Sequence, residues 1–207
     1  ILKLFPCLFR SFPASAFHAY QERIMANLMM KQWTEKKAAL LELVNPVLVQ
    51  LLLKSSSFLA INYTDLLAAL KHRGKESRAS ACEFLVHCTV IPALAERVIN
   101  LCAGSDGREL ADRLYKCTSD KEKEVRLSAC KVFYALNEIG VMKLKQSKVH
   151  RRFQELYEGM MQSRRTKKSL VEAQKAYKAL QNKMRGIVDE DDVKWPEKDE
   201  DDVPKGL

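Results

Sequence analysis

One plan recurs along this chain: a basic turn followed by an amphipathic helix. The three helices of this plan are expected to begin near Thr34, Lys75 and Lys121, a separation of roughly 40 to 47 residues that is typical of paired-helix repeats. Paired helices of this kind bury their apolar faces against neighbouring pairs, and the turns along one edge form a continuous surface. The pattern therefore predicts an α-solenoid with its function at the edge of the turns.

The last of these helices shows the pattern most clearly. It is expected over residues 119–140 and to end at Gly140, with a charged face opposite the apolar one. The apolar face consists of Val125, Ala129, Val132, Leu136 and Ile139. The other expected helices cover residues 15–29, 34–53 with a bend or break at Pro46, 58–71, 76–90, 92–102 and 107–117.

The composition agrees with a helical chain. Among 207 residues there are only 6 Pro and 7 Gly, whereas Leu, Ala, Lys and Glu are plentiful, a balance that favours helices over a β-sandwich or barrel. We predict an all-α fold: an α-solenoid of HEAT-like helical hairpins with a basic C-terminal helix and an acidic disordered tail. The expected divisions are an N-terminal segment of a larger chain at 1–13, the solenoid at 14–145, the basic helical extension at 146–188 and the tail at 189–207.

The charge is divided unevenly along the chain. The whole chain has a formal net charge of +9, but residues 1–188 carry 32 Lys or Arg against 17 Asp or Glu, and residues 189–207 carry 3 against 9. A basic body fits an acidic partner, such as nucleic acid, a membrane surface or an acidic protein. The tail has no apolar periodicity and is expected to be disordered.

The chain contains six cysteines: Cys7, Cys82, Cys88, Cys102, Cys117 and Cys130. None of them forms a CxxC pair, and their spacing is not that of a disulfide-rich domain. They are expected to be reduced core residues of a cytosolic or nuclear protein. The apolar start of the chain is interrupted by Lys3 and Pro6 and lacks a clear cleavage site, and no stretch is long enough to cross a bilayer. We expect neither a leader nor a membrane partner.

Motifs for catalysis are missing from the sequence. It contains no GxxxxGK[ST], GxGxxG, HExxH or GxSxG, so we predict that the protein is not an enzyme and has no cofactor. The nearest thing to a metal site is Cys82, His87 and Cys88. Steps of five and one on a helix do not converge on one face, so we expect core packing there and no metal.

The basic turns carry the functional prediction. Trp33 stands among lysines in the first turn, and an aromatic residue surrounded by cationic side chains is typical of an interface hot spot. Basic residues recur in the second and third turns, so an acidic binding partner is expected. The turn residues of interest are Trp33, Lys36, Arg73, Lys75, Arg78, Lys121, Lys123 and Arg126.

The stretch "KQWTEKKAALLEL" at 31–43 resembles the opening repeat of a tumour-overexpressed-gene (TOG) domain, the tubulin-binding HEAT module of microtubule polymerases and CLASP proteins. The match runs through Trp33, Lys36 and Leu40. "DLLAALKHRGKESRASACEFLVHC" and "SDKEKEVRLSACKVFYALNEIG" resemble later repeats in the same order, and the matches together cover residues 17–43 and 63–145. A TOG domain has roughly six hairpins, whereas this chain has room for about four, so the array is expected to be shortened.

The resemblance implies a non-enzymatic module that binds αβ-tubulin and supports microtubule dynamics. Trp33 would be the aromatic anchor, Arg78 and Arg126 the charged contacts, and the remaining basic turn residues would support them. The basic extension would contact the microtubule lattice through Lys148, Arg151, Arg152, Arg164, Arg165, Lys167 and Lys168. The protein would be cytoplasmic and lie on microtubules, at the spindle or centrosome.

Two other functions remain open from the sequence. One is a HEAT-repeat scaffold or adaptor for another protein, in which the acidic tail regulates access to the basic helix. The other is a basic nucleic-acid-binding helical protein. It would bind without sequence specificity, because no base-reading motif accompanies the basic residues.

Overall fold

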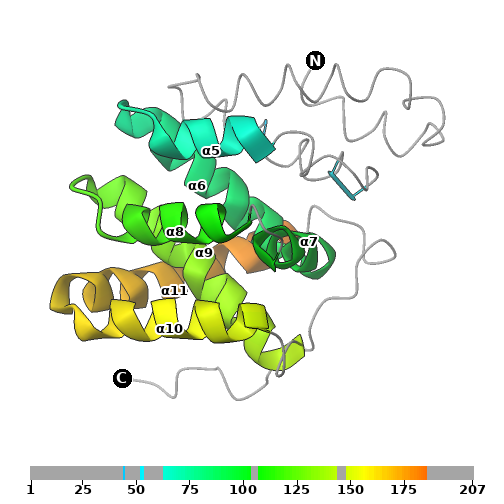
Figure 1. Cartoon of the computed structure of the whole chain (residues 1–207). Helices are drawn as coiled ribbons and strands as arrows, with labels where there is room; N and C mark the ends of the chain where they lie inside the picture. Colours follow the sequence, from blue (N-terminus) through cyan, green and yellow to red (C-terminus); the bar gives the residue numbers. More distant parts are fainter. Residues whose placement is uncertain (1–43, 45–51, 54–62, 104–106, 144–147, 186–207) are drawn as a thin grey trace.

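The structure is a computed structural model that describes residues 44, 52–53, 63–103, 107–143 and 148–185. Trp33, Lys36, the helix expected over 15–29, all of the helix expected over 34–53 except residues 44 and 52–53, and the acidic tail lie outside these residues. All elements of the described part are helices (Figure 1), which confirms the all-α fold. They are α5 (Tyr63–Lys71), α6 (Lys75–Val90), α7 (Pro92–Ala103), α8 (Gly107–Thr118), α9 (Lys123–Lys143), α10 (Lys148–Gln162) and α11 (Arg164–Arg185).

Six of these helices form three antiparallel pairs in two layers. The pairs are α5 with α6, α8 with α9, and α10 with α11. The first helices of the pairs, α5, α8 and α10, lie in one layer, whereas the second helices, α6, α9 and α11, lie in the other (Figure 1). Helix α7 joins the first pair to the second and packs on α6, α8 and α9. The three turns within the pairs therefore meet at the left edge of Figure 1.

Helix α9 lies at the centre of the second layer, between α6 and α11. Its expected apolar face is buried at Val125, Ala129, Val132 and Leu136. The opposite face differs from the prediction, because Phe133, Tyr134 and Ala135 are buried as well. A helix with neighbours on two sides needs apolar residues on most of its surface, and the exposed charged residues of α9 are Lys123 and Glu124 in its first turn and Glu138 near its other end.

Two predicted boundaries are wrong. Helix α9 continues through Gly140 to Lys143 instead of ending at the glycine; a glycine inside a helix costs only about 1 kcal/mol relative to alanine. The basic extension is two helices, α10 and α11, instead of one, and they are divided at Ser163. Pro92 begins α7, where its missing N–H group costs no hydrogen bond.

Helix α11 shares the core of the other helices. Its buried residues follow the heptad-like rhythm expected from the sequence, since Leu170, Ala173, Tyr177 and Met184 are all buried. The Tyr177 hydroxyl donates a hydrogen bond of 2.6 Å to the backbone carbonyl of Thr89 in α6. The tyrosine ring also packs edge-on against Tyr134 of α9. The basic extension is thus fixed to the rest of the molecule by its apolar side.

A short sequence repeat underlies the second layer. Residues 75–83 read KESRASACE and residues 123–131 read KEVRLSACK, and both segments begin their helices, α6 and α9. Burial follows the repeat, because Ala81 and Cys82 have the same buried state as Ala129 and Cys130. The same local sequence therefore makes the same packing surface twice. No described helix is long and apolar enough to cross a membrane.

Candidate functional site

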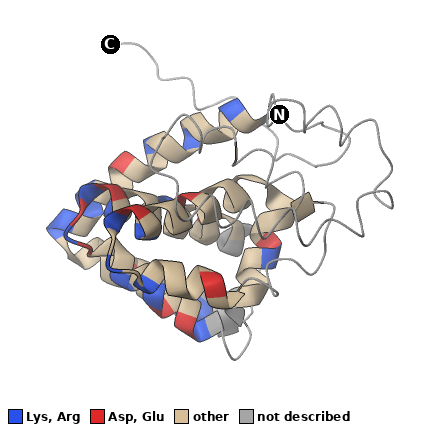
Figure 2. Ribbon diagram, turned by 90° about the horizontal axis from the view of Figure 1, so that it is seen from above, with Lys and Arg blue, Asp and Glu red and all other residues tan. Residues whose placement is uncertain are grey.

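The three turns form one edge of the molecule, which we call the turn edge: residues 72–74 between α5 and α6, 119–122 between α8 and α9, and Ser163 between α10 and α11. Lys and Arg residues gather along this edge of the ribbon, with Asp and Glu residues among them (Figure 2). Residues 120 and 121 of the middle turn are bound by an arginine from each neighbouring pair: Arg78 binds Asp120, and Arg165 binds the Lys121 carbonyl oxygen. We call these the first and second turn junctions.

The first junction is an arginine gripping a carboxylate with two hydrogen bonds. Arg78 Nε donates to Asp120 Oδ2 at 2.9 Å and Nη2 donates to Oδ1 at 3.1 Å. Arg78 Nη1 donates to the carbonyl oxygens of His72 and Arg73, both at 2.8 Å. The two side chains are only 12% and 13% exposed. Two-pronged pairs of this kind are the strong form of charged hydrogen bond, so Arg78 is an internal tie between two turns.

Asp120 organises the second turn as well as the junction. Its Oδ1 accepts a hydrogen bond of 2.9 Å from the Glu122 backbone N–H, which satisfies a donor that precedes α9. Burial is the largest single influence and raises the pKa of the Asp120 carboxyl, but the hydrogen bonds from Arg78 and the Glu122 N–H, together with the positive charges of Arg78 and Lys121, outweigh it and the pKa is lowered. In return, the hydrogen bond to Asp120 raises the pKa of Arg78. Both groups therefore stay charged at neutral pH.

Arg126 occupies in α9 the place that Arg78 occupies in α6. Its Nη1 donates to the carbonyl oxygens of Asp120 and Lys121, both at 2.7 Å. In each turn the arginine Nη1 thus donates to the carbonyl oxygens of the residues five and six positions before it. The difference is on the other side of the guanidinium: Arg126 Nε is buried and meets no hydrogen-bond partner among the described residues.

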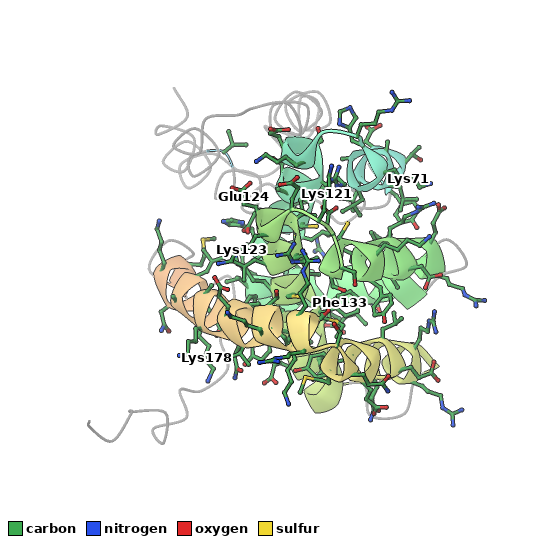
Figure 3. All side chains as sticks on the ribbon, turned by 90° about the vertical axis from the view of Figure 1, so that its left-hand side faces the viewer. Lys71, Lys121, Lys123, Glu124, Phe133 and Lys178 are labelled. Carbon is green, nitrogen blue, oxygen red and sulfur yellow. The ribbon has the colours of Figure 1, made fainter. Side chains whose placement is uncertain are left out.

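Exposed lysines at the turn edge form a ladder of ion pairs along the second layer. Lys75 Nζ lies 3.8 Å from Glu124, and Lys123 Nζ lies 2.7 Å from Glu172 (Figure 3). The hydrogen bond from Lys123 lowers the pKa of the Glu172 carboxyl. These pairs are open to solvent, so each contributes little to stability. Arg73 and Lys121 are exposed, and no ion pair joins them to an acidic group in the described part.

The basic extension does not form a single patch. Lys148, Arg151 and Arg152 lie in the first turns of α10, whereas Arg164, Arg165, Lys167 and Lys168 begin α11 at the turn edge. The two groups are separated by the length of α10, about 20 Å at the rise of an α-helix. Arg152 is bound to Asp112 at 2.9 Å and to Glu155 at 3.5 Å. Only the α11 group therefore adds to the charge of the turn edge.

A second polar cluster lies between α6 and α9. Glu83 Oε1 accepts hydrogen bonds from the Ser128 hydroxyl and from Lys131 Nζ, the latter at 2.6 Å. Burial favours the neutral Glu83 carboxyl, but Lys131 and Ser128 lower its pKa. His87 contacts the Glu83 carbonyl through Nδ1 at 2.8 Å, and burial lowers its pKa. The cluster is a packed interface, and Ser128 is only 4% exposed.

Four cysteines of the described part are core residues. Cys82, Cys88, Cys117 and Cys130 are free and buried, and burial raises the pKa of the Cys130 thiol to about 12. A thiol with such a pKa is protonated and unreactive at neutral pH. Among the residues that the structure describes, no group of three or more His, Cys, Asp or Glu is placed to hold a metal ion.

The sequence interpretation did not include Asp120 or its bond to Arg78. The signal that could have found it is the internal repeat: the segments that begin α6 and α9 share an arginine at the same place, and Asp120 precedes the second segment. Arg73, Lys75, Lys121 and Lys123 do lie at the turn edge, with exposed side chains. Arg78 and Arg126 lie there too, but they are held mainly by their own turns.

Comparison of the chain with models of protein families, with curated proteins and with solved structures finds no match.

Proposed function

We propose that this chain is a non-enzymatic α-solenoid module that binds the acidic surface of αβ-tubulin through its turn edge and acts on microtubules in the cytoplasm. The observation that carries the proposal is the alignment of three turns along one edge, tied by the Arg78–Asp120 junction and by the bond from Arg165. A rigid edge keeps several cations in fixed positions. Rigid placement of charge reduces the ordering cost of binding an extended partner.

The charge of the edge supports an acidic partner. The ladder neutralises Lys75 and Lys123 in part, but Arg73, Lys121 and the exposed basic residues at the start of α11 add further positive charge. A concentration of one sign speeds the approach of an oppositely charged partner and confers salt dependence. The partner should therefore present carboxylates along a line.

The resemblance to TOG domains directs the proposal to tubulin. Two of the resembling segments, 65–88 and 119–140, cover most of the α5–α6 pair and most of α9, and their turns lie beside each other at the turn edge. The paired packing of the helices supports a solenoid arrangement of this part of the chain. Trp33 would extend the same edge as an aromatic anchor.

The experiment is co-elution with unpolymerised αβ-tubulin in size-exclusion chromatography at near-physiological salt. The test variant is Arg73→Glu with Lys121→Glu, because both side chains are exposed and make no ion pair within the described residues. The matched control is Arg108→Glu with Lys183→Glu, which makes the same change of charge at helix ends remote from the turns.

We expect the intact chain and the control to co-elute with tubulin and the turn-edge variant to elute separately. Equal loss in both variants would mean that net charge alone, and not the turn edge, is responsible. Failure of the intact chain to co-elute would overturn the tubulin assignment and leave a scaffold for another acidic partner as the remaining function.

A further inference from the structure

The two turn junctions begin from the same anchor but end differently. In the first junction, the Arg78 guanidinium closes its own turn through Nη1 and then grips the Asp120 carboxylate through Nε and Nη2. In the second, Arg126 closes its own turn through Nη1 in the same way. Because the two arginines are held in the same way, the contact of Arg78 with a carboxylate is a template for what the Arg126 guanidinium can bind.

The carboxylate of this template is missing at Arg126. Both hydrogen bonds of the Arg126 side chain in the described part are made by Nη1, and the buried Nε has no partner. A buried donor without an acceptor is costly, because the group has lost its water without replacing it. Arg152 Nε is also without a partner, but the rest of its guanidinium already holds Asp112 and Glu155.

A second arginine shares a hydrogen-bond acceptor with Arg126. The next turn along the edge reaches Arg126's turn through Arg165, whose Nη2 donates to the Lys121 carbonyl oxygen at 3.4 Å. Arg126 Nη1 donates to that same oxygen at 2.7 Å. Two guanidinium groups of like charge therefore converge on one carbonyl oxygen. An anion beside them would neutralise the repulsion and offer acceptors to both.

We infer that Arg126 and Arg165 form a carboxylate-binding site for an aspartate or glutamate side chain of an acidic peptide segment, which takes at Arg126 the place that Asp120 takes at Arg78. Lys121 flanks the site with an exposed side chain and favours an acidic neighbourhood around that carboxylate, whereas Lys123 is already paired with Glu172. The first junction offers no such site because its carboxylate is already supplied by the chain. The inference deepens the proposed function, on which it rests for its biological partner, but its test contains no tubulin.

The acidic segment has two possible sources with the same chemistry. One is a partner protein. The other is the chain's own sequence at 189–207, which reads DEDDVKWPEKDEDDVPKGL and contains nine acidic residues. The two sources are distinguished by a full-length chain in which all nine are changed to Asn or Gln.

The binding experiment uses a fluorescent Gly-Glu-Gly-Glu-Gly peptide and its Gly-Gln-Gly-Gln-Gly counterpart, both blocked at the N-terminus and amidated at the C-terminus, followed by fluorescence anisotropy. We expect the glutamate peptide to bind and the glutamine peptide not to bind. Arg126→Gln and Arg165→Glu should each weaken binding by roughly tenfold or more, the range for loss of a charged hydrogen bond. Arg164→Glu, which makes the same charge change at the neighbouring exposed position, should weaken it much less.

Tail neutralisation then identifies the source. Tighter peptide binding by the neutralised chain would show that the tail occupies the site in the free protein, whereas unchanged binding would show that the site is open to a partner. Both results support the carboxylate site. Equal binding of the two peptides, or equal effects of Arg165→Glu and Arg164→Glu, would overturn it. Displacement of the peptide by inorganic phosphate far more readily than by acetate would overturn the choice of a carboxylate.

A stability measurement keeps the inference testable if Arg126→Gln does not fold. Arg165→Glu places a carboxylate beside Arg126 from within the chain, so it should raise the midpoint of thermal unfolding by about 2 to 4 °C. Arg164→Glu should leave the midpoint unchanged. A fall in the midpoint of Arg165→Glu would contradict the inferred geometry.

Discussion

The first and second turn junctions differ in one respect that decides their roles. Both use an arginine that ties down the two carbonyl oxygens of its own turn. Arg78 then binds an aspartate of the next turn, whereas Arg126 shares the Lys121 carbonyl oxygen with a second arginine, Arg165. Where the repeat supplies its own carboxylate, the junction is a structural tie; where it does not, the guanidinium is left for an external ligand. A repeated motif can thus serve stability at one position and binding at another.

Removing the carboxylate of the first junction should have the largest effect. Asp120→Ala leaves a mostly buried arginine without its ion pair and removes the acceptor for the Glu122 N–H. We expect the free energy of unfolding to fall by about 2 to 4 kcal/mol, measured by urea denaturation. Asp112→Ala is the matched control, because its pair with Arg152 is about two-fifths exposed and should cost less than about 1 kcal/mol. Equal losses would remove the distinction between the junction and an ordinary surface pair.

Double-mutant cycles should give opposite signs for the two junctions. The Arg78→Met and Asp120→Ala cycle should give a favourable coupling of about 2 kcal/mol, within the range for residues in direct contact. The Arg126→Met and Arg165→Met cycle should give an unfavourable coupling, because each change relieves the repulsion felt by the other guanidinium. Favourable coupling at both junctions would show that Arg126 already has an internal anionic partner.

The pH dependence of stability should separate the junctions further. The Asp120 pKa is lower in the folded chain than its ordinary value of 3.8, so the unfolded chain takes up a proton first as the pH falls. The stability that Asp120 contributes is complete above about pH 4 and is lost as the pH falls through the lower, folded pKa. The difference in free energy of unfolding between the wild type and Asp120→Asn should therefore shrink below about pH 4.

The corresponding control is Arg126→Gln. No carboxylate is bound to this arginine in the described part of the chain, so its difference from the wild type should stay constant across the same pH range. A difference that shrinks in acid would reveal a carboxylate at the second junction, and thermal unfolding at several pH values would measure it.

The ladder of exposed ion pairs should give the smallest effects. Lys75→Ala and Lys123→Ala remove pairs whose side chains are exposed to solvent, and salt screens charges of this kind over about 8 Å at physiological ionic strength. We expect small decreases in the thermal midpoint at low salt that disappear at high salt, with the larger decrease for the closer pair of Lys123. Decreases that persist in high salt would mean that the ladder holds the turn edge together.

Much of the helical framework could be predicted from the sequence because it depends on local periodicity. The apolar spacing located α6, α7 and α8 within one or two residues, and the buried positions of α11 followed the expected rhythm. Failures came where local signals were overruled. Gly140 predicted the end of α9, but the helix continues to Lys143. The run of basic residues gave no signal for the break between α10 and α11 at Ser163.

The candidate site was only partly predictable. Exposed lysines in turns are visible in a sequence, and Lys121 and Lys123 were found in this way. The roles of Arg78 and Arg126 were not, because they depend on whether a residue far along the chain supplies a carboxylate. Asp120 supplies a carboxylate to Arg78. The neighbouring turn supplies a second arginine near Arg126, because Arg165 donates to the Lys121 carbonyl oxygen. The role of Trp33 stays a prediction, since it lies outside the described residues.

Arg78 and Arg126 differ in whether a carboxylate of the chain already holds the guanidinium, and the side-chain Nε–Hε signals of a chain labelled with ¹⁵N-arginine report on this difference. On titration with the Gly-Glu-Gly-Glu-Gly peptide, the Arg78 signal should stay in place because Asp120 already holds that group, whereas the Arg126 signal should shift. A shift of both signals, or of neither, would show that the two arginines do not differ in this way.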